Sequence, residues 1–217
     1  MNSIQAKKDD EKLAEAEQDK CKAEYQIKLK AFRDFLKKTK DMKNVESVFQ
    51  VLQSHGKIDE CIRYAEMIER YDTVIVHYIN KQEHAKALQK VTSIADEGKR
   101  NETMLRYASI FLNKCAKETI KELQSQYYRK IDIPKLMPAF MNIHDEQDQI
   151  EALNYITNYC IIRRSSRSKT VHNMAFFFHS KINDSEKLIR FLESEEAKKS
   201  KGHPIYFEVD YALNVCK

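Results

Sequence analysis

The stretch from Val51 to Ala95 contains short amphipathic helices that follow one another with barely a turn between them. Its apolar residues recur three or four positions apart, which is the spacing of one face of an α-helix. The stripes of the second, third and fourth helices are Ile58, Cys61, Ile62, Ala65 and Ile68; Val74, Ile75, Tyr78 and Ile79; and Ala87, Leu88, Val91 and Ile94. A helix this short buries its apolar face only by stacking antiparallel on its neighbours. The sequence therefore predicts an all-α fold, an α-solenoid of stacked antiparallel helical hairpins.

The same spacing extends over most of the chain. Residues 1–24 carry helix formers and charges but almost no apolar stripe, which predicts a charged, poorly packed helical lead-in. Residues 25–217 are predicted to form the solenoid. Its other stripes are Tyr25, Leu29, Phe32, Phe35 and Leu36; Val45, Val48, Phe49 and Leu52; Leu105, Ala108, Phe111 and Leu112; Ile120, Leu123 and Tyr127; Leu136, Met137, Phe140 and Met141; Ile150, Leu153, Ile156 and Cys160; Val171, Met174, Ala175, Phe178 and Ile182; Leu188, Phe191 and Leu192; and Val209, Leu213 and Cys216. The last stripe has no hairpin partner, so we expect a segment of a longer solenoid.

Capping residues delimit several of these helices. Gly56 is predicted to end a helix in the left-handed conformation, and Gly98 is predicted to close another helix. Pro138 is expected to kink or shorten its helix, and one longer helix is predicted from Asp145 to Ile162. The predicted N-caps are Asn44, Asp72, Asn101, Asp132 followed by Pro134, and Asn183 with Glu186.

Composition excludes several classes of protein. Only 3 glycines occur in 217 residues, which disfavours a sheet protein with tight hairpins and leaves no Gly-rich phosphate loop. The charged first residues predict no signal peptide, and the apolar runs are far shorter than the ~18 residues that span a bilayer. The net charge of +5 permits weak attraction to phosphates or an anionic lipid surface without demanding it. Scattered cysteines without a C-x-x-C pair predict reduced, buried thiols in a cytosolic protein; they are Cys21, Cys61, Cys115, Cys160 and Cys216.

The 7 histidines form no metal-binding or catalytic motif. His77 and His84 lie seven residues apart, as do His172 and His179, and on one helix that spacing separates two rings by about 10 Å, too far to share a metal. We expect His77 and His84 on different helices, and the histidines as groove-lining or half-buried residues. No nucleophile elbow is present. We therefore predict no catalytic, cofactor-binding or metal-ligating residue, no cofactor and no enzymatic activity.

The segment RRSSRSK, Arg163 to Lys169, is the clearest loop. Its simplest interpretation is a solvated connection between helices. It also resembles a basophilic kinase site, and an acidic partner or lipid headgroups are further candidates for contact. The residues that we expect to matter most are packing residues, namely Leu52, Ala65, Ile75, Leu88, Leu136, Leu153, Ala175 and Leu192.

An ordered set of short motifs resembles the clathrin-heavy-chain-repeat region of the vacuolar protein sorting-associated protein 18 (deep-orange) family. The segment Leu136 to Asn142 is similar to that family's L-I-P-A-L-V-N, and Val171-His172-Asn173 resembles its helix-opening I-H-N. The other motifs are Ser54-His55-Gly56, Tyr64-Ala65, Tyr71, Val74, His77-Tyr78, Ala87-Leu88, Ala152-Leu153 with Tyr155, Leu188-Ile189, Phe191-Leu192-Glu193, and Tyr211-Ala212-Leu213 with Cys216. The resemblance covers the chain from about Tyr25 to the C-terminus.

This resemblance implies a non-catalytic scaffold segment of a core subunit of HOPS and CORVET. These complexes tether endosomal, lysosomal or vacuolar membranes before fusion. It implies the other core subunits as partners and a peripheral place on late endosome, lysosome or vacuole membranes. The family's β-propeller and RING domain are not found here, so no ubiquitin-ligase activity is assigned. The alternatives are another helical-repeat adaptor, a helical binder of nucleic acid or phosphoinositide through the loop 163–169, and an enzyme whose site forms only with another subunit.

Overall fold

The computed structural model describes residues 2–38, 45–182 and 185–200. All regular secondary structure in these ranges is helical, which confirms the predicted all-α class. The chain divides into two compact units, Met1–Val74 and Ile75–Lys217. The predicted caps at Asn44 and Asn183 and the predicted stripe 209–216 lie outside the described residues.

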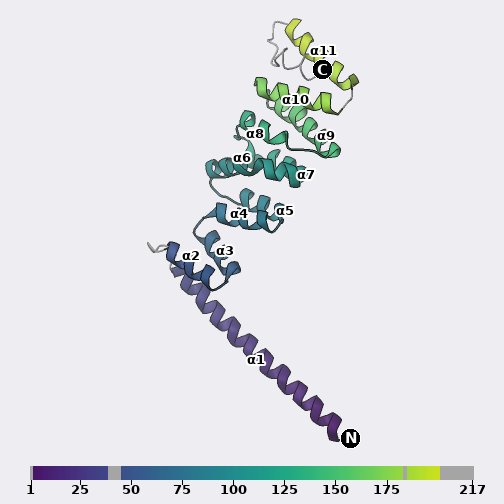
Figure 1. Cartoon of the computed structure of the whole chain (residues 1–217). Helices are drawn as coiled ribbons and strands as arrows, with labels where there is room; N and C mark the ends of the chain where they lie inside the picture. The colour runs from purple at the N-terminus through teal and green to yellow at the C-terminus, as the bar shows by residue number, and fades with distance from the viewer. Residues whose placement is uncertain (1, 39–44, 183–184, 201–217) are drawn as a thin grey trace. The chain divides into compact units, whose positions relative to one another are not determined.

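The first unit contains α1 (Asn2–Lys38), α2 (Val45–Ser54), α3 (Ile58–Met67) and the first residues of α4 (Tyr71–Asn80). Helix α1 is continuous through residue 24 (Figure 1), so the boundary between lead-in and solenoid stays a prediction. Within this unit α3 packs on both α1 and α2. The two short helices therefore share an apolar interface, as a helical hairpin requires.

The C-terminal part of α1 is fastened to α3 by one buried side chain and one ion pair. Leu36 of the predicted stripe is buried, whereas Tyr25 and Phe35 are exposed. The guanidinium of Arg33 donates from Nη2 to Oε1 of Glu60 over 2.6 Å and from Nε to both carboxylate oxygens over 3.1 Å. This bidentate hydrogen bond lowers the pKa of Glu60 below its ordinary value. The Glu60 carboxylate is therefore charged at neutral pH and holds α1 in register on α3.

Helices α2, α3 and α4 end in the same left-handed turn. The residues that follow them, Gly56, Glu69 and Gln82, have φ values of 64°, 60° and 60°. In each turn a backbone N–H donates to the carbonyl five residues earlier, as Arg70 does to Ala65 over 2.9 Å. This is the Schellman pattern of helix ends. The prediction at Gly56 is confirmed, but the two equivalent turns were missed because neither carries glycine.

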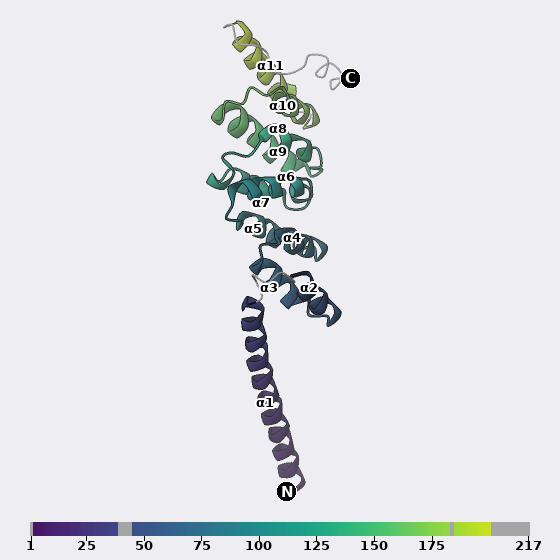
Figure 2. The same cartoon turned by 90° about the vertical axis from the view of Figure 1, so that its left-hand side faces the viewer.

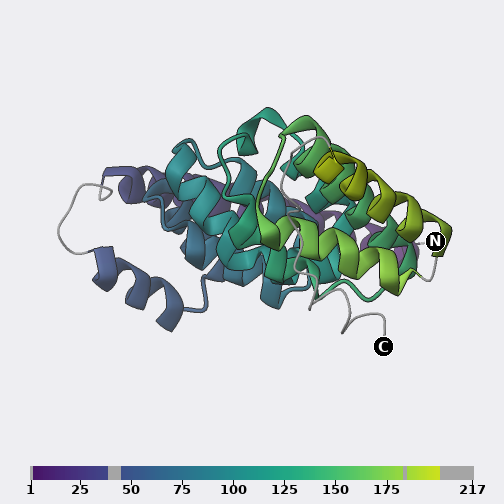
Figure 3. The same cartoon turned by 90° about the horizontal axis from the view of Figure 1, so that it is seen from above.

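The second unit continues from α4 as a stack of helices (Figures 1 and 2). Its elements are α5 (His84–Thr92), α6 (Glu97–Lys114), α7 (Ala116–Leu123), the 3-10 turn η1 (Gln126–Tyr128), α8 (Ile133–Phe140), α9 (Glu146–Asn154), the π-helix η2 (Tyr155–Arg163), α10 (Lys169–Lys181) and α11 (Ser185–Ser200). Helix α6 packs on α5, α7 and α8, and α10 packs on α8, α9, η2 and α11. Seen from above in Figure 3, the green α10 and the yellow-green α11 run side by side.

Helices α5 to α10 thus each pack on at least two other elements of this unit, which is how a solenoid buries short amphipathic helices. Its core is built from the predicted stripes and from additional aromatic residues. The largest fully buried side chains are Ile75, Ile94, Met104, Phe111, Leu112, Leu123, Tyr128, Phe140, Tyr155, Phe176 and Phe178.

Several predicted helix boundaries are wrong. Gly98 does not end a helix and Asn101 does not cap one, because α6 begins at Glu97 and contains both. The cap is Asp96, whose carboxylate accepts a 2.6 Å hydrogen bond from the N–H of Lys99. Likewise Asp72 lies in the first turn of α4 and not before it. The prediction at Asp132 is confirmed, since its carboxylate accepts from the N–H of Lys135.

Two residues that were predicted to face the core, Tyr127 and Met141, are exposed instead. Tyr127 was predicted to face the core, but α7 ends at Leu123 and the 3-10 turn buries Tyr128 instead. Helix α8 ends at Phe140, two residues after the interior Pro138, which has no backbone donor, and Met141 is exposed.

The predicted single α-helix from Asp145 to Ile162 changes character halfway. After α9 the backbone continues as the π-helix η2, in which hydrogen bonds run to the fifth residue back. The wider turns bury Tyr155 and Tyr159 in addition to the predicted Ile156 and Cys160. The rings of Tyr155 and Tyr159 stack with their centroids 5.3 Å apart. Tyr155 also stacks on Phe140, with the ring centroids 5.6 Å apart. This aromatic column fixes the position from which the basic loop leaves.

Candidate interaction surfaces

The predicted packing residues are buried with one exception. Ala65, Ile75, Leu136 and Ala175 have no exposed surface, and Leu52, Leu88 and Leu153 are nearly as deeply buried. Leu192 on α11 is half-buried. A side chain as small as that of alanine with no exposed surface marks a close approach between helices. Ala65 and Ala175 therefore mark places where neighbouring helices touch.

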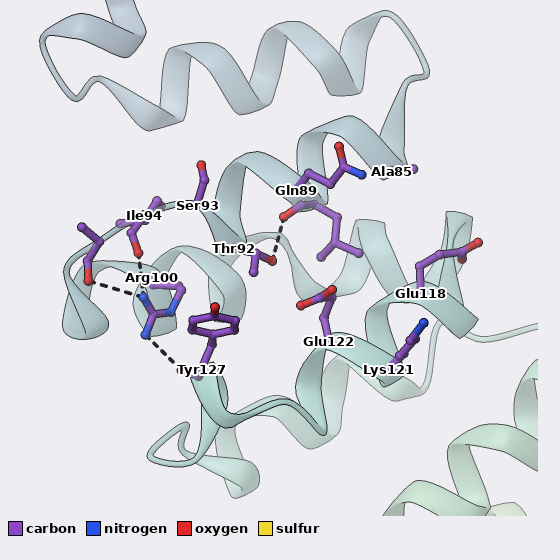
Figure 4. Close-up of a pocket in the computed structure, with 12 residues that line it drawn as sticks. Ala85, Gln89, Thr92, Ser93, Ile94, Arg100, Glu118, Lys121, Glu122 and Tyr127 are labelled. Atoms are coloured by element: carbon purple, nitrogen blue, oxygen red, sulfur yellow. Dashed lines mark hydrogen bonds between the residues drawn. The ribbon is translucent and has the colours of Figure 1, made fainter.

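One recess of the second unit lies between α5 and α7 and has a volume of about 650 Å³ (Figure 4). Leu88, Gln89 and Thr92 line it from α5, and Glu118, Lys121 and Glu122 line it from α7. Arg100 and Tyr127 close one end. The recess carries acidic, basic and neutral polar groups together, and no arrangement of a nucleophile with a base is present among them.

Arg100 is a buried cation whose partners are backbone carbonyls. Its Nη1 donates to the carbonyl of Ile94 over 2.6 Å and to that of Ala95 over 3.4 Å, and its Nη2 donates to the carbonyl of Tyr127 over 3.2 Å (Figure 4). The guanidinium also lies over the rings of Tyr127 and Tyr128, at 5.3 and 6.0 Å from their centroids. Arg100 therefore joins the turn after α5 to the turn after α7. Sequence reasoning missed it, because an arginine within the charged run 97–102 carries no signal of burial.

A second recess, of about 360 Å³, lies where the turn after α7 meets the end of η2. The turn contributes Gln124, Ser125, Gln126 and Arg129, and η2 with the following residue contributes Tyr159, Arg163 and Arg164. The predicted loop is confirmed as an irregular segment between Arg163, where η2 ends, and Lys169, where α10 begins. Two of its arginines thus line a recess, whereas Arg167 does not.

The histidines lie on separate helices or far apart, as their spacing indicated. His77 is on α4 and His84 begins α5, which confirms that prediction. His172 and His179 are both buried on α10, His172 with its Nε2 3.0 Å from the carbonyl oxygen of Ser166, and His179 stacked on Phe191. Within the described ranges, no group of three or more His, Cys, Asp or Glu side chains is placed to hold a metal ion.

Two of the cysteines are buried as predicted. Cys61 and Cys160 are free and buried, and burial raises the pKa of both thiols, that of Cys160 to about 12. These thiols therefore stay protonated at neutral pH and are poor nucleophiles. Cys115 is half-buried, and the prediction is wrong for Cys21, which is exposed on α1. Cys216 lies outside the described residues.

No helix among the described residues is long and apolar enough to cross a membrane.

Three curated proteins are similar to most of this chain. "Vacuolar sorting protein 18" of Arabidopsis thaliana is 24% identical over 201 residues, which are 89% of this chain and 20% of the relative. "Vacuolar protein sorting-associated protein 18 homolog" of Danio rerio is 23% identical over 85% of this chain and 19% of the relative. "Vacuolar membrane protein pep3" of Schizosaccharomyces pombe is 22% identical over 85% of this chain and 20% of the relative. The chain spans about a fifth of the length of these relatives.

The match to a family model is more specific than these pairwise similarities. Residues 71–217 match the second half of the VPS18 alpha-solenoid domain. That range starts with α4 and covers every helix of the second unit. The α-solenoid of stacked helical hairpins is therefore confirmed. Because the family model covers more than half of its residues, the chain belongs to the VPS18 family and contains the second half of that family's α-solenoid domain.

Proposed function

We propose that this chain is a non-catalytic scaffold segment of a core subunit of the endolysosomal tethering complexes HOPS and CORVET, acting in transport to the lysosome or vacuole. The observation that carries the proposal is the match of residues 71–217 to the VPS18 solenoid. The printed names of the relatives, which refer to vacuolar sorting and to the vacuolar membrane, support the same cellular process. Its partners are the other core subunits, and its place on late endosome, lysosome or vacuole membranes is peripheral.

The packing of the second unit supports a mechanical role. Helices α5 to α10 are each held by two or more neighbours, and Arg100 ties two inter-helix turns through three carbonyls. Such cross-links keep the turns at a fixed spacing, which is what a scaffold needs to present contacts to partners.

The test is affinity purification of the tagged chain from its own cells at moderate salt, followed by mass spectrometry. We expect the other core tethering subunits to be recovered. Ala175→Asp, which disrupts a packed interface, should lose them, whereas Arg167→Gln in the exposed loop should keep them. Recovery of an unrelated assembly, or of nucleic acid in place of tethering subunits, would contradict the proposal.

A further inference from the structure

The recess between the turn 124–129 and the end of η2 has an unusual charge. Three arginines line it, Arg129, Arg163 and Arg164, and its lining includes no aspartate or glutamate. Other arginines in the described part of the chain have carboxylate partners; these pairs are Arg33–Glu60, Arg70–Glu46, Arg106–Glu102 and Arg190–Glu186. None of the three arginines of the recess has such an ion pair with a described residue. The recess therefore concentrates positive charge that is not paired with a carboxylate in residues 2–38, 45–182 or 185–200.

Two buried polar atoms on the recess also have no hydrogen-bond partner. They are the hydroxyl oxygen of Ser125 and Nη1 of Arg164. A buried donor without an acceptor costs about 1–3 kcal/mol, so native proteins rarely keep one without a reason. Both belong to residues that line the same volume of about 360 Å³. The recess is therefore lined by two residues whose buried polar atoms have no hydrogen-bond partner within the described structure.

Backbone hydrogen bonds fix the end of η2 and the residues after it, where Arg163 and Arg164 lie. The N–H of Arg164 donates to the carbonyl of Tyr159 over 2.9 Å, and the N–H of Ser166 donates to the carbonyl of Cys160 over 3.0 Å. The guanidinium of Arg163 lies over the ring of Tyr159 at 5.7 Å. Tyr159 and Cys160 are buried, so the end of the π-helix is anchored in the core. Segments of π-helix occur often at functional sites. This one ends at Arg163 and is followed by Arg164, and both residues line the same recess.

The chemistry of the lining selects the ligand. A phosphate monoester carries a charge of about −1.5 to −2 and three acceptor oxygens, which suits three guanidinium forks better than the single charge of a carboxylate. The side-chain amides of Gln124 and Gln126 at the same recess offer a donor and an acceptor each, the complement of a peptide group. Arginine clusters of this kind recognise phosphorylated protein segments. We propose that this recess binds a phosphorylated serine or threonine of a partner protein.

The proposal goes beyond the scaffold role and is tested on the isolated chain. Isothermal titration measures binding of the pentapeptide Ala-Ala-phosphoserine-Ala-Ala, with the unphosphorylated peptide and a glutamate peptide as comparisons. The variants are Arg163→Gln and Arg164→Gln. Arg167→Gln is the matched control, because it removes the same charge from the same segment without touching the recess. Circular dichroism checks that all three variants keep the wild-type helix content.

We expect the phosphopeptide alone to bind, with a roughly tenfold or greater loss of affinity in each recess variant and less than a twofold change in the control. Binding should also weaken as the pH falls below about 6, where the phosphate loses its second charge. No phosphopeptide binding, or an equal loss in Arg167→Gln, would overturn the proposal. It would also be overturned if the chain sedimented with vesicles containing phosphatidylinositol phosphate while ignoring the peptide, since the ligand would then be a lipid.

Discussion

Replacing Arg100 with methionine tests whether a buried cation holds two turns of the solenoid together. The substitution removes the 2.6 Å bond to Ile94 and the 3.2 Å bond to Tyr127 and leaves both carbonyls without that donor. Hydrogen bonds of charged groups contribute about 1.5–3 kcal/mol each, so the gross loss is about 3–6 kcal/mol. Removing a buried charge also removes its desolvation cost, which offsets part of that loss. We expect the free energy of unfolding to fall by about 2–4 kcal/mol.

The assay is urea denaturation at neutral pH, followed by circular dichroism. Arg100→Lys keeps the charge but loses the planar fork, so it reaches one carbonyl at a time and should cost about half as much as methionine. The control is Arg106→Met on the same helix, whose exposed pair with Glu102 contributes at most about 1 kcal/mol. The reasoning is refuted if Arg100→Met unfolds at the wild-type urea concentration, or if the lysine and methionine variants are equally destabilised.

Other substitutions probe the packing, the turns and the ion pair of the first unit. Ala65→Asp and Ala175→Asp each put a charge into a fully buried position and should cost more than about 3 kcal/mol, seen as a lower thermal midpoint; unchanged melting in both would mean that the helix register is wrong. Gly56 and Gln82 both have positive φ, so in urea titrations Gly56→Ala should destabilise the protein by about 1 kcal/mol and Gln82→Gly should stabilise it by up to about 1 kcal/mol. A change of the free energy of unfolding in the same direction for both variants would contradict this. Because the pKa of Glu60 is lowered by its arginine partner, its contribution to stability is present above its ordinary value of 4.5 and is lost as the pH falls below it; Glu60→Gln should flatten this acid dependence of the thermal midpoint.

The helical stripes could be predicted from sequence because their burial follows from a periodicity of 3.6 residues. Leu88, Leu136 and Ala175 are buried for that reason alone. The turns at Glu69 and Gln82 could not be predicted in the same way. Residues other than glycine adopt a left-handed conformation only when the packing of the flanking helices compensates for it, and no local pattern records that.

The surface features depend on contacts between segments distant in sequence. Arg100 is recognisable as a clamp only once the carbonyl of Tyr127 lies beside it. The loop arginines were noticed in the sequence, but nothing in it paired Arg163 and Arg164 with Arg129 or separated them from Arg167. The π-helix that directs them was predicted as ordinary α-helix, because its apolar residues satisfy both spacings.

The most direct test of the scaffold role is reconstitution from purified components. The 217-residue chain would be mixed with each separately purified core tethering subunit and analysed by size-exclusion chromatography with light scattering. The proposed role predicts a stable complex with at least one subunit, and loss of that complex on Ala175→Asp. A chain that is folded by circular dichroism yet elutes alone in every mixture would contradict it.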